Sequence, residues 1–309
     1  MFERKKFGFV TKIVEKHIIY WVIYMKKGLC LAGGGIKGAA HIGALKVFEE
    51  ENIKFDCFAG TSSGSIVATL IALGYSADEM YQLFKKYAKS IKYIEWKNIF
   101  KIIYGLIMKR KLIVNGLNTG KAIEKSMKKA CEIKNIENIQ EIKKELLIPA
   151  VDADSGKVYI FNSCNIDKKT KEEIYVSKAP IPKAVRASCS YPVVFSPCEF
   201  GDTELLDGGI KENIPWRELK EIGCDKVVSI NFQNKYKKKC CENIIEVAER
   251  SLELMCDELY KYEIDKIDYL HTIKSDNVSL LEVEKMDELY NQGYIQTKDK
   301  IEEIKKYLA

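Results

Sequence analysis

Residues 28–38 read GLCLAGGGIKG, a short apolar run followed at once by a cluster of glycines. Apolar runs of this length that end in glycines are typical of buried strands. From Ala39 to Glu50 the apolar residues recur at helical spacing. The stretch therefore predicts a buried strand, a glycine loop and a helix in direct succession.

The same order is repeated further along the chain. FDCFA at 55–59 is a second apolar run, GTSSG at 60–64 is a tight turn, and residues 65–73 form a strongly apolar helix that ends at Gly74. Strands that alternate with helices form a parallel sheet with helices on its faces. The first part of the chain therefore predicts an α/β fold with a mostly parallel central sheet.

The remaining sequence shows no internal repeat and no linker rich in Pro or Ser. Strands are predicted at 146–151, 157–161, 226–232 and 269–273, the first two joined by a turn. Helices are predicted at 76–89, 119–131, 137–145, 181–188 and 242–262, and again near the C-terminus. We expect residues 25–309 to form a single domain.

The composition is that of a globular protein. Of 309 residues, 47% are hydrophobic and 30% are charged, which excludes a disordered chain. The 50 Lys and Arg against 44 Asp and Glu give a net charge of +6, a mixed surface that predicts no nucleic-acid partner.

The ten cysteines include no Cys-x-x-Cys pair, so the sequence predicts no metal site. Several of them, such as Cys30, Cys57 and Cys224, lie in apolar runs, where a reduced cysteine is a small hydrophobic residue. We therefore expect a reducing, cytoplasmic environment.

The N-terminal residues 1–24 allow two interpretations. Their apolar run at 17–25 is too short to cross a bilayer, which takes about 20 residues, and no cleavage site of small residues follows it. The segment either lies on a membrane surface through its basic and aromatic side chains, or it is extra sequence ahead of a native start at Met25.

Residues 92–111 combine large apolar and aromatic side chains with six basic residues and a single acid, Glu95. One interpretation is a core helix with a solvated face. The other is a mobile cover that makes peripheral membrane contact, with its aromatic side chains in lipid and its lysines at anionic headgroups.

Gly60, Thr61, Ser62, Ser63 and Gly64 match the pattern Gly-x-Ser-x-Gly. They lie between an apolar strand and an apolar helix, which is the context of a nucleophile elbow. The glycines permit a sharp turn, and Ser62 then stands at the positive end of a helix. The neighbouring Ser63 is interpreted as an N-cap or turn residue.

The glycine loop also matches Gly-x-Gly-x-x-Gly. A dinucleotide site would need an acidic residue at the end of the second strand to hold the ribose, but that strand runs into the Gly-x-Ser-x-Gly turn. We favour an oxyanion hole, because N–H groups of a glycine loop that opens a helix converge on a developing negative charge. Its candidate residues are Gly33, Gly34, Gly35, Lys37 and Gly38, where Lys37 either adds positive charge or is merely solvated.

A serine nucleophile needs a base. Asp207 is followed by Gly208 and Gly209, which leave room for a close approach to the elbow, and a carboxylate beside a serine can take its proton. A plain turn is the other interpretation of Asp-Gly-Gly.

The histidines are weaker candidates for the base. His41 lies one turn into a helix and is expected to face the core. His271 matches the Ser…Asp…His order of α/β-hydrolases, but it lies inside a strand-like run.

The glycine loop, the Gly-x-Ser-x-Gly turn and Asp-Gly-Gly, in this order, resemble the patatin-like phospholipases. Residues 39–45, 151–156 and 187–192 are also similar to bacterial members, and the resemblance runs from about Lys27 to about Asn234. Lys37 is a departure, because many members have Arg there.

This resemblance implies a three-layer α/β/α fold and a serine lipid acyl hydrolase of phospholipase A or lysophospholipase type. By analogy Ser62 is the nucleophile, Asp207 is the proton acceptor and the glycine loop is the oxyanion hole, with no metal or organic cofactor. The alternatives are an acyltransferase or thioesterase that uses the same dyad, and a non-catalytic lipid-binding protein that regulates at the membrane.

Overall fold

The computed structural model describes residues 25–88, 104, 115–233, 244–262, 264–275, 278 and 282–309. The predictions about residues 1–24 fall outside these ranges, and so do those about residues 92–111 except for Tyr104. Among the helices described, none is both long enough and apolar enough to span a bilayer.

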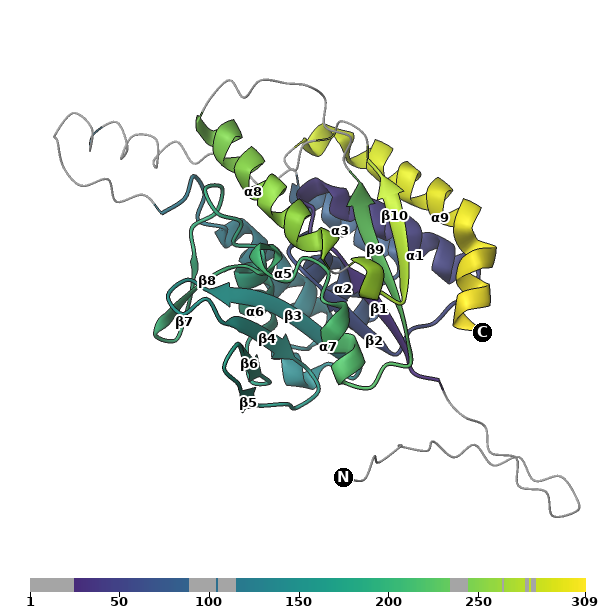
Figure 1. Ribbon diagram of the computed structural model, residues 1–309, viewed down its shortest axis with the longest axis horizontal. Helices are drawn as coiled ribbons and strands as arrows, with labels where there is room; N and C mark the ends of the chain where they lie inside the picture. The colour runs from purple at the N-terminus through teal and green to yellow at the C-terminus, as the bar shows by residue number, and fades with distance from the viewer. Residues whose placement is uncertain are drawn as a thin grey trace, which may run out of the picture.

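One mostly parallel sheet runs through the described part of the chain (Figure 1). Its strands follow the order β10-β9-β1-β2-β3-β4-β6-β5, and β8 pairs with β3 and β7. The neighbours from β10 to β3 are parallel, whereas β3 is antiparallel to both β4 and β8. The strands are β1 Lys27–Leu31, β2 Cys57–Gly60, β3 Glu145–Asp152, β4 Val158–Asn162, β5 Lys168–Lys169, β6 Glu173–Val176, β7 Cys198–Phe200, β8 Thr203–Asp207, β9 Lys226–Gln233 and β10 Tyr269–Lys274.

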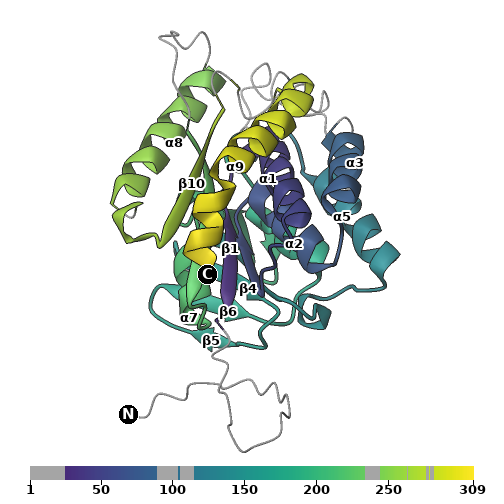
Figure 2. The same ribbon diagram turned by 90° about the vertical axis from the view of Figure 1, so that its right-hand side faces the viewer.

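Helices cover both faces of this sheet, which gives three layers (Figure 2). Alternate residues of β1 show the two sides, since Leu29 packs into one core and Cys30 into the other. The first face carries α1 Gly38–Glu50, α2 Ser63–Ala72, α3 Ala77–Ala88, α5 Lys121–Lys134, α6 Ile181–Ser188 and α9 Met286–Leu308. The second carries α7 Trp216–Glu221 and α8 Ile244–Lys261. The predicted α/β fold with a mostly parallel sheet is confirmed.

The helix predicted at 137–145 is wrong. The segment holds a single 3₁₀ turn at Ile139–Glu141, and β3 begins at Glu145. The backbone N–H of Ile139 donates to Ala179 O (2.9 Å), so pairing with a distant segment replaces a helical hydrogen bond. Long-range backbone pairing of this kind is invisible to a search for helical periodicity.

The C-terminal helix α9 packs against α1 with backbone almost touching backbone. A Cβ added at Gly293 of α9 would overlap the carbonyl group of Ala40, and one added at Gly43 of α1 would overlap the carbonyl group of Tyr290. Each glycine therefore makes room for the other helix, and α9 is part of the same packed core as the first helix of the fold.

We predict that Gly293→Ala lowers the free energy of unfolding by about 1–3 kcal/mol, because the added methyl forces the two helices apart. In an open helix position the same change would stabilise by up to about 1 kcal/mol, so the sign separates crowding from helix propensity. Urea unfolding measures the difference. Asn291→Ala, at an exposed position of α9, is the control, and an equal response of the two variants would contradict the close packing.

Candidate active site

Ser62 lies at the sharp turn between β2 and α2. Its backbone is in an unusual region, with φ 52° and ψ −123°, as the N-cap of α2. Added Cβ atoms at Gly60 and Gly64 would overlap the backbones of Gly64 and Leu31 respectively. The turn is therefore open only to glycine at both positions, and it holds Ser62 in the geometry of a nucleophile elbow.

The elbow is fixed from outside by neighbouring loops. Thr61 is buried and its hydroxyl donates to Glu212 O (2.6 Å). The N–H of Ser62 donates to Ser188 Oγ (3.0 Å) at the end of α6. Ser63 opens α2 with its buried Oγ lacking a hydrogen-bond partner among the described residues. The Ser62 hydroxyl is left to face the cavity.

Asp207 ends β8 and is 2% exposed. Its Oδ1 accepts a hydrogen bond from Gly209 N–H (2.8 Å), and its own N–H donates to Ser190 O (3.0 Å). Gly208 packs against the backbone of Pro149 in β3. The Asp-Gly-Gly segment is therefore a turn that also holds its carboxylate in one orientation.

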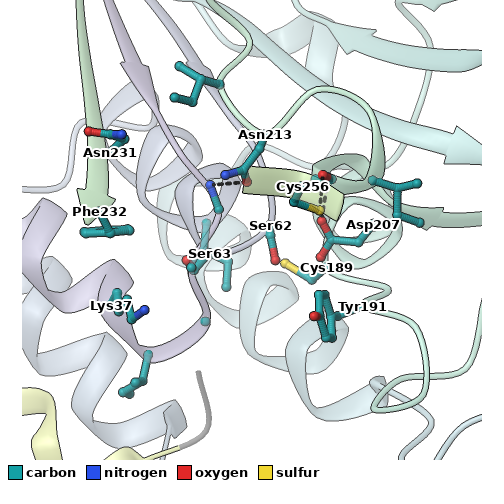
Figure 3. A pocket seen from close by; sticks show the side chains of 18 of the residues that line it. Lys37, Ser62, Ser63, Cys189, Tyr191, Asp207, Asn213, Asn231, Phe232 and Cys256 are labelled. Carbon is teal, nitrogen blue, oxygen red and sulfur yellow. Dashed lines mark hydrogen bonds between the residues drawn. The ribbon is translucent and has the colours of Figure 1, made fainter. Parts of the chain in front are cut away.

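Figure 3 shows the Ser62 hydroxyl and the Asp207 carboxylate pointing toward the same part of the cavity, with the Cys189 thiol beside them. Burial raises the pKa of Asp207 to about 7, against lowering by the Ser62 hydroxyl, Gly209 N–H and Arg186. The second carboxylate oxygen, Oδ2, makes no hydrogen bond of normal geometry with any described residue. The Asp207 carboxylate therefore has one oxygen available to accept a proton from the Ser62 hydroxyl.

Arg186 organises the backbone around this pair. It is 2% exposed, and its guanidinium donates to Ser190 Oγ (2.6 Å), Thr119 O (2.7 Å) and Ser196 O (2.6 Å). It also favours the ionised form of Asp207 and so lowers the pKa of that carboxyl. Sequence reasoning missed Arg186, although the neighbouring 187–192 segment belongs to the resemblance.

The glycine loop crosses the same cavity between β1 and α1. The N–H of Gly33 is already used, because it donates to Asn213 through both O (3.3 Å) and Oδ1 (3.1 Å). Among the described residues, the N–H groups of Gly34 and Gly35 have no acceptor. Of the predicted oxyanion residues, these two offer donors to a ligand.

Lys37 and Gly38 stand further along the loop. Lys37 lines the cavity at 2% exposure, so the interpretation that it is merely solvated is wrong. Burial lowers the pKa of Lys37 to about 8, against raising by Glu253 and Asp257 of α8 and by Glu282. Figure 3 shows Lys37 well apart from Ser62. Gly38 begins α1 against Phe84 and Ser63.

Both candidate histidines are engaged elsewhere. His41 Nε2 is bonded to Ala32 O (2.8 Å), and His271 Nε2 to Thr297 Oγ1 (2.9 Å) on α9. Burial lowers the pKa of each to about 4. Among the described residues, the cavity around Ser62 is lined by no histidine.

The cavity over Ser62 and Asp207 has a volume of about 580 Å³, within the range of roughly 300–1,000 Å³ typical of small-molecule sites. Most of its lining is apolar, and the sequence did not reveal that α3, α5 and α8 contribute to it. No cluster of three His, Cys, Asp or Glu side chains suited to a metal occurs in the described ranges.

Comparison with known proteins places the chain in a family. The model of the patatin-like phospholipases matches residues 29–220, and the chain belongs to that family. It is 30% identical over 207 residues to the YqhO protein of Bacillus subtilis, covering 62% of this chain and 66% of that protein. It is 29% identical over 204 residues to lysophospholipase NTE1 of Candida albicans, covering 66% of this chain and 13% of that protein.

The chain thus spans less than two thirds of the length of these relatives. Among solved structures, VipD from Legionella pneumophila matches 89% of this chain and 66% of its own, with a TM-score of 0.51 at 16% identity. That likeness shows the shared fold.

We predict that Asp207→Asn stabilises the protein at pH 8 but not near pH 4. Because the folded pKa of about 7 lies above the ordinary value, the folded state keeps a proton that the unfolded chain loses. Wild-type stability therefore falls as pH rises from about 4 to 7, and the neutral Asn avoids this loss. The gain reaches the order of a few kcal/mol above pH 7.

Urea unfolding of both proteins at pH 4 and pH 8 measures this gain, and other titrating groups cancel in the difference between them. A difference in unfolding free energy that is the same at both pH values would show that Asp207 is not held in a charge-excluding site.

Proposed function

We propose that this protein is a serine lipid acyl hydrolase in which Ser62 and Asp207 form the catalytic dyad. The observation that carries the proposal is the pair itself. A serine at a strained elbow faces a buried carboxylate whose pKa lies at about 7, where a general base is most effective near neutral pH.

In the first half-reaction Ser62 Oγ attacks the carbonyl carbon of the ester, and its proton passes to the Asp207 carboxylate. The N–H groups of Gly34 and Gly35 donate to the oxyanion that forms. Asp207 then returns the proton to the leaving alcohol as the ester C–O bond breaks. The acyl group remains on Ser62 as an ester.

In the second half-reaction Asp207 takes a proton from a water that attacks the acyl-enzyme. The carboxylic acid leaves as the proton returns to Ser62 Oγ. Every proton transfer uses the one carboxylate, so the chain requires no histidine and no metal for this route. Burial, with Asp207 nearby, raises the pKa of Cys189 to about 12, which keeps that thiol protonated and leaves the nucleophile role to Ser62.

The proposed substrates are fatty acyl esters of phospholipids or lysophospholipids. The family and the lysophospholipase name of the fungal relatives support this class, and so does the apolar lining of the cavity. Transfer of the acyl group to an alcohol or thiol acceptor would use the same first half-reaction.

A fluorophosphonate probe tests the nucleophile. We expect it to label the wild-type protein covalently and to leave Ser62→Ala unlabelled, as read by intact-protein mass spectrometry. Ser251→Ala changes an exposed serine of α8 and should label like the wild type. Labelling of Ser62→Ala, or an unlabelled wild type that is folded, would remove Ser62 from the role of nucleophile.

The base is tested by turnover of a soluble ester. Asp207→Asn should lower kcat/KM roughly 100- to 10,000-fold, the usual contribution of a general base. His271→Asn should keep most of the activity, because His271 bonds to Thr297 instead of lining the cavity. The reverse result, with activity kept in Asp207→Asn and lost in His271→Asn, would establish a triad in place of the dyad.

A further inference from the structure

One side of the cavity is an apolar arm that begins at the nucleophile. Ile66 and Leu70 line the cavity, and they follow Ser62 by four and eight residues, so all three lie on one face of α2. At 1.5 Å per residue, Leu70 stands about 12 Å along the helix from Ser62. The apolar stripe therefore leads away from the reacting atoms.

A second stripe faces it from α5. Ile123, Ser126, Met127 and Ala130 line the cavity at the spacing of one helix face. The one hydroxyl among them is already satisfied, since Ser126 Oγ donates to Ala122 O (2.7 Å) within α5. This wall therefore presents no unpaired polar group to a ligand.

The two stripes run in the same direction. The start of α5 lies beside Arg186, which holds the Ser190 side of the catalytic site, because a Cβ at Gly120 would overlap that guanidinium. The far part of α5 lies beside the end of α2, where the Tyr75 hydroxyl donates to Ala130 O (2.7 Å).

Leu83 and Phe84 of α3 line the same arm, and α3 lies next to α5 (Figure 2). The far end of the arm is closed to solvent. Leu70 is 3% exposed, Met127 is 4% exposed and Ala130 is 1% exposed, although all three line the cavity.

We propose that this arm binds the acyl chain of the substrate and that Leu70, Met127 and Ala130 form the end wall that sets its length. The inference rests on the proposed function in naming an acyl chain. The opposite side of the cavity carries Glu253 and Asp257 of α8, charged groups that an alkyl chain would avoid. The carboxyl end of the chain then lies at Ser62, and its methyl end meets Ala130.

Binding of saturated fatty acids to the full chain carrying Ser62→Ala tests this assignment without any need for turnover. We expect the Kd to fall with each added pair of carbons until the chain reaches the end wall, and then to level or rise. The chain length at which the trend changes is called the break. Adding Ala130→Leu should move this break to shorter chains and weaken the longest acids about tenfold or more, the usual effect of excess methylenes in a closed pocket.

Lys129→Leu is the matched control, because it places the same side chain on the exposed face of α5 and should leave the break where it was. Leu70→Ala enlarges the end wall and should move the break to longer chains, which keeps the test decisive if Ala130→Leu does not fold. An unmoved break in the folded variants would overturn the assignment.

The outcome is separate from that of the proposed function. Chain-length-dependent binding that responds to Ala130→Leu, in a protein whose wild type hydrolyses no ester, would refute the hydrolase and leave the acyl site standing. Ester hydrolysis by the wild type, with no shift of the chain-length break in either variant, would support the hydrolase and refute the acyl site.

Discussion

The first turn of α2 lies directly against the backbone of β1 and β2, with no side chain between them. That contact is possible because Gly60 and Gly64 lack a Cβ. It keeps Ser62 at a positive φ, a strain of about 1–3 kcal/mol that the surrounding packing must hold. The Ser62 hydroxyl points into the cavity. The glycine loop, Asp207 and the apolar arm are all arranged around this hydroxyl.

In the proposed mechanism, burial is what makes Asp207 suitable as the base. In water a carboxylate is too weak a base to compete for a serine proton, but desolvation raises the pKa of Asp207 to about 7. Arg186 limits that rise, and through hydrogen bonds to Thr119, Ser190 and Ser196 it holds the segments beside the pair in place. A single buried carboxylate can then serve both half-reactions. His41 and His271, the two histidines in the described residues, form hydrogen bonds within the core instead.

Local patterns in the sequence were sufficient for the strands and helices around the elbow, because glycine spacing and apolar periodicity act over a few residues. The pairing of Ser62 with Asp207 came from the glycines after Asp207 and from the family resemblance, and both residues line one cavity. What they missed depends on distant contacts. The segment 137–145 pairs with Ala179 instead of forming a helix. Asn213, which is distant in the sequence, accepts a hydrogen bond from the N–H of Gly33. The apolar arm exists only because residues of α2 and α5 line the same cavity in the folded chain.

The central claim is that a carboxylic acid, and no imidazole, is the base. The most direct test is the pH dependence of kcat/KM on a soluble ester, repeated in a water–organic mixture. We predict a rising limb with an apparent pKa of about 7 that moves upward in the mixture, because ionising a neutral acid creates charge and is disfavoured at lower dielectric. A rising limb that stays in place or moves downward would indicate a cationic acid such as imidazolium and would contradict the account.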